Sequence, residues 1–261
     1  MDVNMHKSHS VGHSGPRRGP RSAWYSLPVA LLLGSALLFW IGAPMASHAV
    51  FLVAALGLVW LVERSRPDTG QALGLANQVT LARALMALVL VAALAEPGLF
   101  VTQAWFMVGL ALLLLLLDGV DGWLARRFRE SSAFGARFDM EVDAAFIMTL
   151  CVALWLSGQA AAWVLLIGAM RYAFVAAAAV LPWLGEPLPE RFRRKLVCVV
   201  QVVALLLALA PILGSGLQAA VLAVALISLL LSFGADVNWL YRHRQPPTAS
   251  TSRPPIYRRF S

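Results

Sequence analysis

Four aspartates, Asp118, Asp121, Asp139 and Asp143, stand between two long apolar runs of the sequence. The run ALLLLLL ends directly before Asp118, and the run AAFIMTLCVALWL begins directly after Asp143. If these runs are membrane helices, the carboxylates are costly, at roughly 2.5 to 3.5 kcal/mol each at a helix centre. Four of them at a membrane boundary need a compensating partner.

The spacing of the aspartates indicates which partner. Asp118 and Asp121 are three residues apart, and Asp139 and Asp143 are four apart, so each pair lies on one face of a helix. Two helices joined by a short polar turn would bring the four carboxylates together. Clustered oxygen ligands suit Mg²⁺ or Mn²⁺, and a pair of such ions is a common way to hold a diphosphate. The four aspartates are therefore predicted metal ligands for two ions.

Small residues accompany the aspartates. Gly122 and Ala125 continue the face of the first pair, and Ser132 and Gly135 precede the second pair at helical spacing. Small side chains leave room for a bulky ligand between close helices. The pattern Asp-x2-Asp-Gly-x2-Ala-Arg-x8-Gly-x3-Asp-x3-Asp resembles the signature of the CDP-alcohol phosphotransferases, also named CDP-alcohol phosphatidyltransferases. Its fixed positions are met at Asp118, Asp121, Gly122, Ala125, Arg126, Gly135, Asp139 and Asp143.

The resemblance implies a transferase of phospholipid biosynthesis. A phosphatidyl group would pass from a CDP-alcohol, most often CDP-diacylglycerol, to the hydroxyl of a small acceptor alcohol, with release of CMP. The four aspartates would bind the two ions, and Asp143 would also act as the catalytic general base on the acceptor hydroxyl. The implied CDP-alcohol contacts are Gly122, Ala125, Arg126, Ser132 and Gly135.

A second polar motif precedes the third apolar run. Asn77, Thr80 and Arg83 follow one another at three-residue spacing and share one helix face. Family members often carry a similar motif there as part of the nucleotide pocket, so the resemblance assigns Asn77 and Thr80 to CDP-alcohol binding. The alternative is a helix cap followed by an arginine that reaches the lipid headgroups.

Two basic residues are predicted to bind the acceptor. Arg171 lies near the middle of an apolar run, where a charge needs the aspartate cluster or an anionic substrate as its partner; a structural ion pair is the alternative. Lys195 and Gln201 resemble part of a segment in some phosphatidylglycerophosphate synthases, although Arg194, Val197 and Cys198 depart from it. The basic cluster 191–195 and Arg171 favour a phosphorylated acceptor such as glycerol 3-phosphate or an inositol phosphate. The alternative is that these residues serve the positive-inside topology alone. Serine and choline are the alternative acceptors.

The composition is that of an integral membrane protein, since 60% of the 261 residues are hydrophobic. The net charge of +8 comes from residues interspersed between apolar runs, so no nucleic-acid partner is expected. Cys151 and Cys198 both fall in apolar runs and are interpreted as small buried hydrophobic residues. A transporter or proton relay is the competing class; it explains buried charge but not the glycine, alanine and arginine positions between the carboxylates.

Eight apolar runs approach the roughly 20 residues that span a bilayer. They cover about 24–43, 47–63, 79–96, 100–125, 138–156, 160–182, 196–213 and 216–240. The predicted fold is an all-α, polytopic membrane bundle, with a six-helix family core at 74–242 and two extra transmembrane helices at 24–63. The tails 1–23 and 243–261 are predicted to be disordered. Three roles are compatible with the two extra helices: a homodimer contact, a gate for lipid entry, or simple anchoring.

The basic residues also predict orientation. Loops near 44–46, 97–99, 157–159 and 214–215 contain no lysine or arginine, whereas the opposite connections are basic. By the positive-inside rule, both termini and the aspartate hairpin lie on the cytoplasmic side of the cell (inner) membrane. A site on that side faces the cytoplasmic pool of nucleotide-activated substrates.

Overall fold

The computed structural model describes residues 23–65, 75–128, 133–186 and 192–243, and these residues form an all-α bundle. The helices are α1 (Ala23–Trp40), α2 (Met45–Ser65), α3 (Leu75–Ala93), α4 (Leu99–Thr102), α5 (Ala104–Phe128), α6 (Ala133–Leu156), α7 (Leu165–Val180), α8 (Phe192–Leu209) and α9 (Ser215–His243), with 3₁₀ turns η1 (Ala162–Val164) and η2 (Pro182–Gly185). The prediction of an all-α membrane bundle is confirmed. The predicted tails 1–23 and 243–261 fall almost wholly outside the described residues.

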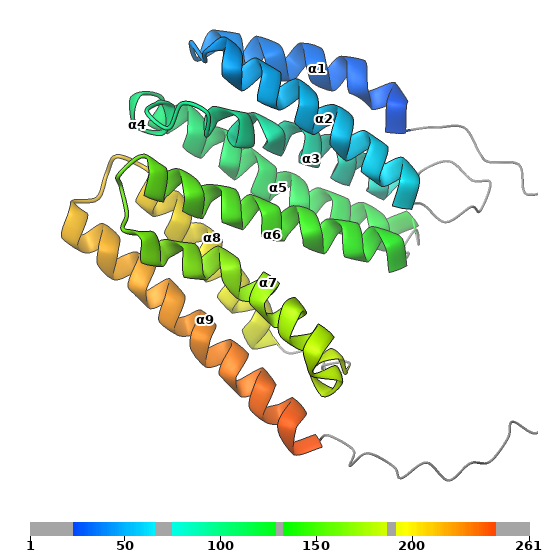
Figure 1. Cartoon of the computed structure of the whole chain (residues 1–261), viewed down its shortest axis with the longest axis vertical. Helices are drawn as coiled ribbons and strands as arrows, with labels where there is room; N and C mark the ends of the chain where they lie inside the picture. The colour runs from blue at the N-terminus through cyan, green and yellow to red at the C-terminus, as the bar shows by residue number, and fades with distance from the viewer. Residues whose placement is uncertain (1–22, 66–74, 129–132, 187–191, 244–261) are drawn as a thin grey trace, which may run out of the picture.

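The long helices lie side by side and alternate in direction (Figure 1). Helix α3 packs against α1, α2, α5 and α6, while α8 packs against α9 and α6 against α7. The two leading helices therefore cover one flank of the bundle, next to α3. The start of α1, the end of α2, the end of α5, the start of α6 and the end of α9 all lie at one end of the bundle (Figure 1).

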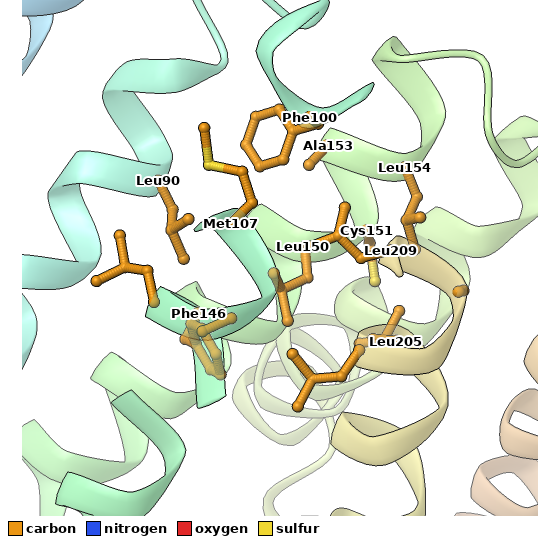
Figure 2. Packing of buried hydrophobic residues seen from close by; sticks show 14 of the residues in the cluster. Leu90, Phe100, Met107, Phe146, Leu150, Cys151, Ala153, Leu154, Leu205 and Leu209 are labelled. Carbon is orange, nitrogen blue, oxygen red and sulfur yellow. The ribbon is translucent and has the colours of Figure 1, made fainter. Parts of the chain in front are cut away.

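Leucine, alanine and phenylalanine side chains fill the interior of the bundle. Figure 2 shows Leu90, Met107 and Leu150 meeting near its centre, and all three are fully buried. Outward-facing side chains are also apolar, for example Leu32 (74% exposed), Phe39 (81%) and Leu231 (70%). An apolar outer surface over an apolar core suits a protein surrounded by lipid.

Within the described ranges, three helices are long and apolar enough to cross a membrane by length and composition, namely Met45–Ser65, Ala162–Val180 and Ser215–His243. Shorter apolar stretches cover Trp24–Trp40, Asn77–Ala93, Ala104–Val120 and Leu196–Leu209. Several helices extend past the predicted apolar runs, because backbone hydrogen bonding and not hydrophobicity decides where a helix ends. Helix α6 begins at Ala133, before the predicted start at 138, so Asp139 and Asp143 lie inside a continuous helix.

Glycines permit tight turns after two helices and a close approach between α6 and α7. Gly42 after α1 and Gly158 after α6 have φ angles of 72° and 73°, which permit the abrupt helix ends there. At Gly168 of α7, a Cβ atom would lie 2.8 Å from Met148 Cα of α6. Glycine at this position lets the two backbones approach closely and so places α7 against the helix that carries Asp139 and Asp143.

Candidate active site

Three of the four aspartates converge at the meeting of α5 and α6. Asp118 comes from α5, and Asp139 and Asp143 come from successive turns of α6. One carboxylate oxygen of each lies within 4.8 Å of the others. The three side chains are 35% to 38% exposed, so the cluster is accessible from outside the bundle.

The compensating charge within the described residues is Arg83 of α3, which is 3% exposed. Its guanidinium donates hydrogen bonds to Asp118, Asp139 and Asp143, the last at 3.1 Å from Nη1 to Oδ1. The alternative interpretation of Arg83 as an arginine that reaches the headgroups is wrong. A planar, always-charged guanidinium can bind several carboxylates at once. Arg83 therefore binds the three aspartates and does not extend to the lipid headgroups.

The oxygen cluster also fits a divalent ion. Carboxylate oxygens are the ligands that Mg²⁺ and Mn²⁺ prefer, and three of them converge from two helices. Arg83 donates to these same carboxylates. An ion bound there would therefore compete with Arg83 for the carboxylate oxygens.

Four of the other predicted ligand-binding residues lie within two helical turns of Arg83 or of a clustered aspartate. On α3, Thr80 is 5% exposed and Asn77 is half-buried, each one turn from the next member of the series that ends at Arg83. Gly122 lies one turn after Asp118, and Gly135 lies one turn before Asp139. The backbones of Asp121, Ala125 and Arg126 belong to α5, but their side chains lie outside the described residues, as does all of Ser132.

A cavity of about 340 Å³ opens beside the cluster, between α6, α7, α8 and α9. Its polar lining comes from Asp143, Arg171, Arg194, Gln201, Ser232 and Asp236. Asp143 belongs to both the carboxylate cluster and this cavity. A ligand in the cavity would therefore lie against one of the clustered carboxylates.

Arg171 does not contact the aspartate cluster within the described residues. Its Nη2 donates to Glu141 Oε1 at 2.6 Å. Arg171 is therefore paired with Glu141, which lies between Asp139 and Asp143 in the sequence of α6. The alternative of a structural ion pair is thus present, although Arg171 also lines the cavity. Lys195 belongs to the first turn of α8, and its side chain lies outside the described residues.

Sequence reasoning overlooked one residue of the cavity wall, Asp236, and misinterpreted another, Cys198. Asp236 of α9 is 7% exposed, and its Oδ1 accepts a hydrogen bond from Arg193 Nη2 at 2.6 Å. A lone carboxylate in the apolar run 216–240 was a signal available in the sequence. Cys198 is exposed and lines the cavity, so its interpretation as a buried hydrophobic residue is wrong, whereas Cys151 is buried as expected.

Comparison with known proteins identifies one family. The family model described as CDP-alcohol phosphatidyltransferase matches residues 73–231, which run from the start of α3 into α9 and include the three clustered aspartates. Helices α1 and α2 precede the match. No curated protein and no solved structure shows a significant match to the chain.

Proposed function

Because the chain belongs to the CDP-alcohol phosphatidyltransferase family, we propose that it transfers the phosphatidyl group of CDP-diacylglycerol to a phosphorylated alcohol, with glycerol 3-phosphate as the first candidate. Transfer from a CDP-alcohol to an acceptor alcohol in a membrane is the reaction of the family. The observation that carries the finer proposal is the shared position of Asp143, which lies in the carboxylate cluster and also on the wall of a cavity containing arginines.

The carboxylate cluster would receive the diphosphate. When bound, two Mg²⁺ or Mn²⁺ ions held by Asp118, Asp121, Asp139 and Asp143 supply positive charge for the diphosphate and the leaving CMP. Asp143 takes the proton of the acceptor hydroxyl, whose oxygen attacks the lipid-bearing phosphorus while the bond to CMP breaks. Access from outside the bundle supports this role, since all three described side chains are about a third exposed.

The nucleotide would lie along the small-residue face of α5 and α6. The residues proposed to contact the CDP-alcohol are Asn77, Thr80, Gly122, Ala125, Arg126, Ser132 and Gly135. Arg126 offers a guanidinium that can bind a phosphate through two hydrogen bonds. Glycine and alanine at three of these positions leave space for the cytidine.

The acceptor would occupy the cavity of about 340 Å³. Arg171 and Lys195 are the proposed acceptor-binding residues. Arg171 and Arg194 line the cavity wall. Several guanidinium and ammonium groups at one site favour an acceptor with a phosphate. A cavity of this size suits a small polyol phosphate better than a second lipid.

The protein would cross the cell membrane eight times with both termini in the cytoplasm. Support comes from the bundle end that gathers the start of α1 and the ends of α2 and α9 (Figure 1). At this end Arg64 lies over the Trp60 ring, with its guanidinium carbon 5.6 Å from the ring centroid. An arginine with a neighbouring tryptophan is typical of the interface on the cytoplasmic side.

The test is CMP release by the purified protein in detergent. CDP-diacylglycerol and Mn²⁺ or Mg²⁺ are supplied with glycerol 3-phosphate, inositol phosphate, serine or choline, each tested alone, and Asp139→Asn serves as the inactive control. We expect metal-dependent release with a phosphorylated acceptor and none in the control. Failure with every acceptor, or release that persists in Asp139→Asn, contradicts the proposal.

A further inference from the structure

Gln201 of α8 is a buried polar side chain whose Nε2 donor has no acceptor among the described residues. The residue is 5% exposed, and its Nε2 is fully enclosed without a hydrogen-bond partner among the described residues. Buried donors in native proteins nearly always have an acceptor, because burial without one costs free energy. Since Gln201 lines the cavity that also contains Asp143, the missing acceptor is expected to come from a ligand.

A second donor of the same cavity is in the same state. The Nε atom of Arg171 is buried without a partner in the described part of the chain, while Nη2 of the same guanidinium is held by Glu141. The two donors come from different helices, α7 and α8, and line one cavity. A ligand that satisfies both must offer oxygen acceptors at two separate positions.

The charged and neutral groups of the cavity differ in what they recognise. Arg194 and Gln201 lie on one face of α8, seven residues and therefore about 10 Å apart along the helix axis. Arginines bind phosphate oxygens, whereas a neutral amide is suited to a neutral hydroxyl. Ser232 of α9, which is 4% exposed, adds a hydroxyl group to the lining.

We propose that Gln201 determines acceptor specificity by binding a second, non-reacting hydroxyl of a phosphorylated polyol, an inference that rests on the transfer reaction proposed above. The amide of Gln201 donates a hydrogen bond to the oxygen of that hydroxyl. Arg171 binds the phosphate, and Asp143 receives the proton of the reacting hydroxyl. A site built around a substrate hydroxyl discriminates strongly against an analogue without it, because its own polar group is then left unpaired.

Glycerol 3-phosphate and 3-hydroxypropyl phosphate form a matched pair of probes. They share the phosphate, the chain length and the reacting hydroxyl, and only the first has a middle hydroxyl. We expect CMP release by the natural protein to show a kcat/KM at least about tenfold higher for glycerol 3-phosphate. In Gln201→Met, which keeps the length of the side chain but has no donor, this preference should fall to within about twofold.

Two further measurements separate this role from a structural one. Replacing an unpartnered buried amide with an apolar side chain should leave the thermal midpoint of Gln201→Met unchanged or raise it, and glycerol 3-phosphate should stabilise the natural protein more than the variant. The matched control is Gln218→Leu in α9, because Gln218 is also buried but already donates to Ala208 O at 2.7 Å. Its acceptor preference should not change.

The outcomes distinguish this inference from the proposed reaction. A preference that is absent in the natural protein, or that survives in Gln201→Met, overturns the role of Gln201 while transfer itself stands. No CMP release with any acceptor overturns both, and release only with serine or choline overturns the polyol phosphate. If inositol phosphate alone is used, the same ratio is measured against a deoxyinositol phosphate, and its loss in Gln201→Met supports the inference.

Discussion

The carboxylate cluster and the neighbouring cavity share Asp143 but differ in how their polar groups are partnered. In the cluster, three carboxylates converge on the buried guanidinium of Arg83. In the cavity, Gln201 Nε2 and Arg171 Nε have no acceptor within the described residues. Charges inside a membrane bundle must be neutralised for the chain to fold, whereas a neutral or already paired donor can stay open for a ligand at smaller cost.

The largest loss of stability is expected from Arg83→Met, which removes the shared partner of the three carboxylates. Without the guanidinium, three carboxylates repel one another, and we expect a loss of about 2 to 3 kcal/mol of stability after allowance for their partial exposure. Mn²⁺ should restore more stability to this variant than to the natural protein, because the ion no longer competes with Arg83. Thermal unfolding in detergent, with and without Mn²⁺, measures both effects. Equal stabilisation of the two proteins by Mn²⁺ would show that the ion and Arg83 do not compete.

Gly168→Ala tests the close approach that forms one wall of the cavity. The new Cβ would lie 2.8 Å from Met148 Cα, so the helices must separate at a cost of about 1 to 3 kcal/mol. The matched control is Gly109→Ala in α5, where no atom lies within 4 Å of the added Cβ. Alanine should stabilise that helix slightly, since glycine costs backbone entropy. Opposite signs in the two thermal midpoints are expected, and a harmless Gly168→Ala contradicts the packing.

Asp236→Asn tests whether the ion pair between Asp236 and Arg193 stabilises the cavity wall. The variant weakens the contact with Arg193, which is partly exposed, so a loss of about 1 kcal/mol is expected. Arg193→Met should cost a similar amount, and the double variant less than the sum of the two. Additive losses in thermal unfolding would mean that the two side chains do not stabilise one another.

Glu141→Gln should have the smallest effect on stability, under about 1 kcal/mol, because Glu141 is 57% exposed. Its effect on acceptor binding should be clearer, since Glu141 fixes the guanidinium of Arg171 on the cavity wall. We expect a KM for the acceptor raised about two- to fivefold with little change in kcat, measured by CMP release. Rescue by Glu141→Asp would support a positioning role, and an unchanged KM would exclude it.

Residue spacing within one helix was enough to predict much of the fold and part of the site. Eight apolar runs predicted the long helices, and the intervals of three and four residues placed aspartates of two helices on facing sides. Helix ends were less accurate, as at α6, where the helix continues into polar sequence. Hydrophobicity marks the membrane part of a helix, while hydrogen bonding and capping decide where the helix itself ends.

Partners between helices could not be read from the sequence. Arg83 binds carboxylates that lie 35 to 60 residues further along the chain, and Arg193 binds Asp236 across 43 residues. The need for a partner was recognised for the four aspartates, but the identity of the partner depends on which helices pack together. The unpartnered Nε2 of Gln201 could not be predicted from the sequence either. Only the packing around the side chain shows that no acceptor is present among the described residues.

Asp143→Asn is the decisive variant for the proposed reaction, since Asp143 belongs both to the carboxylate cluster and to the cavity wall. Turnover is followed as CMP release, and binding of labelled CDP-diacylglycerol is measured in parallel. Loss of the general base should lower kcat by about 10²- to 10⁴-fold while lipid nucleotide binding largely survives. Glu96→Gln, the same chemical change in the turn after α3, is the control and should keep full activity. A fully active Asp143→Asn protein would contradict the role of Asp143 as the base.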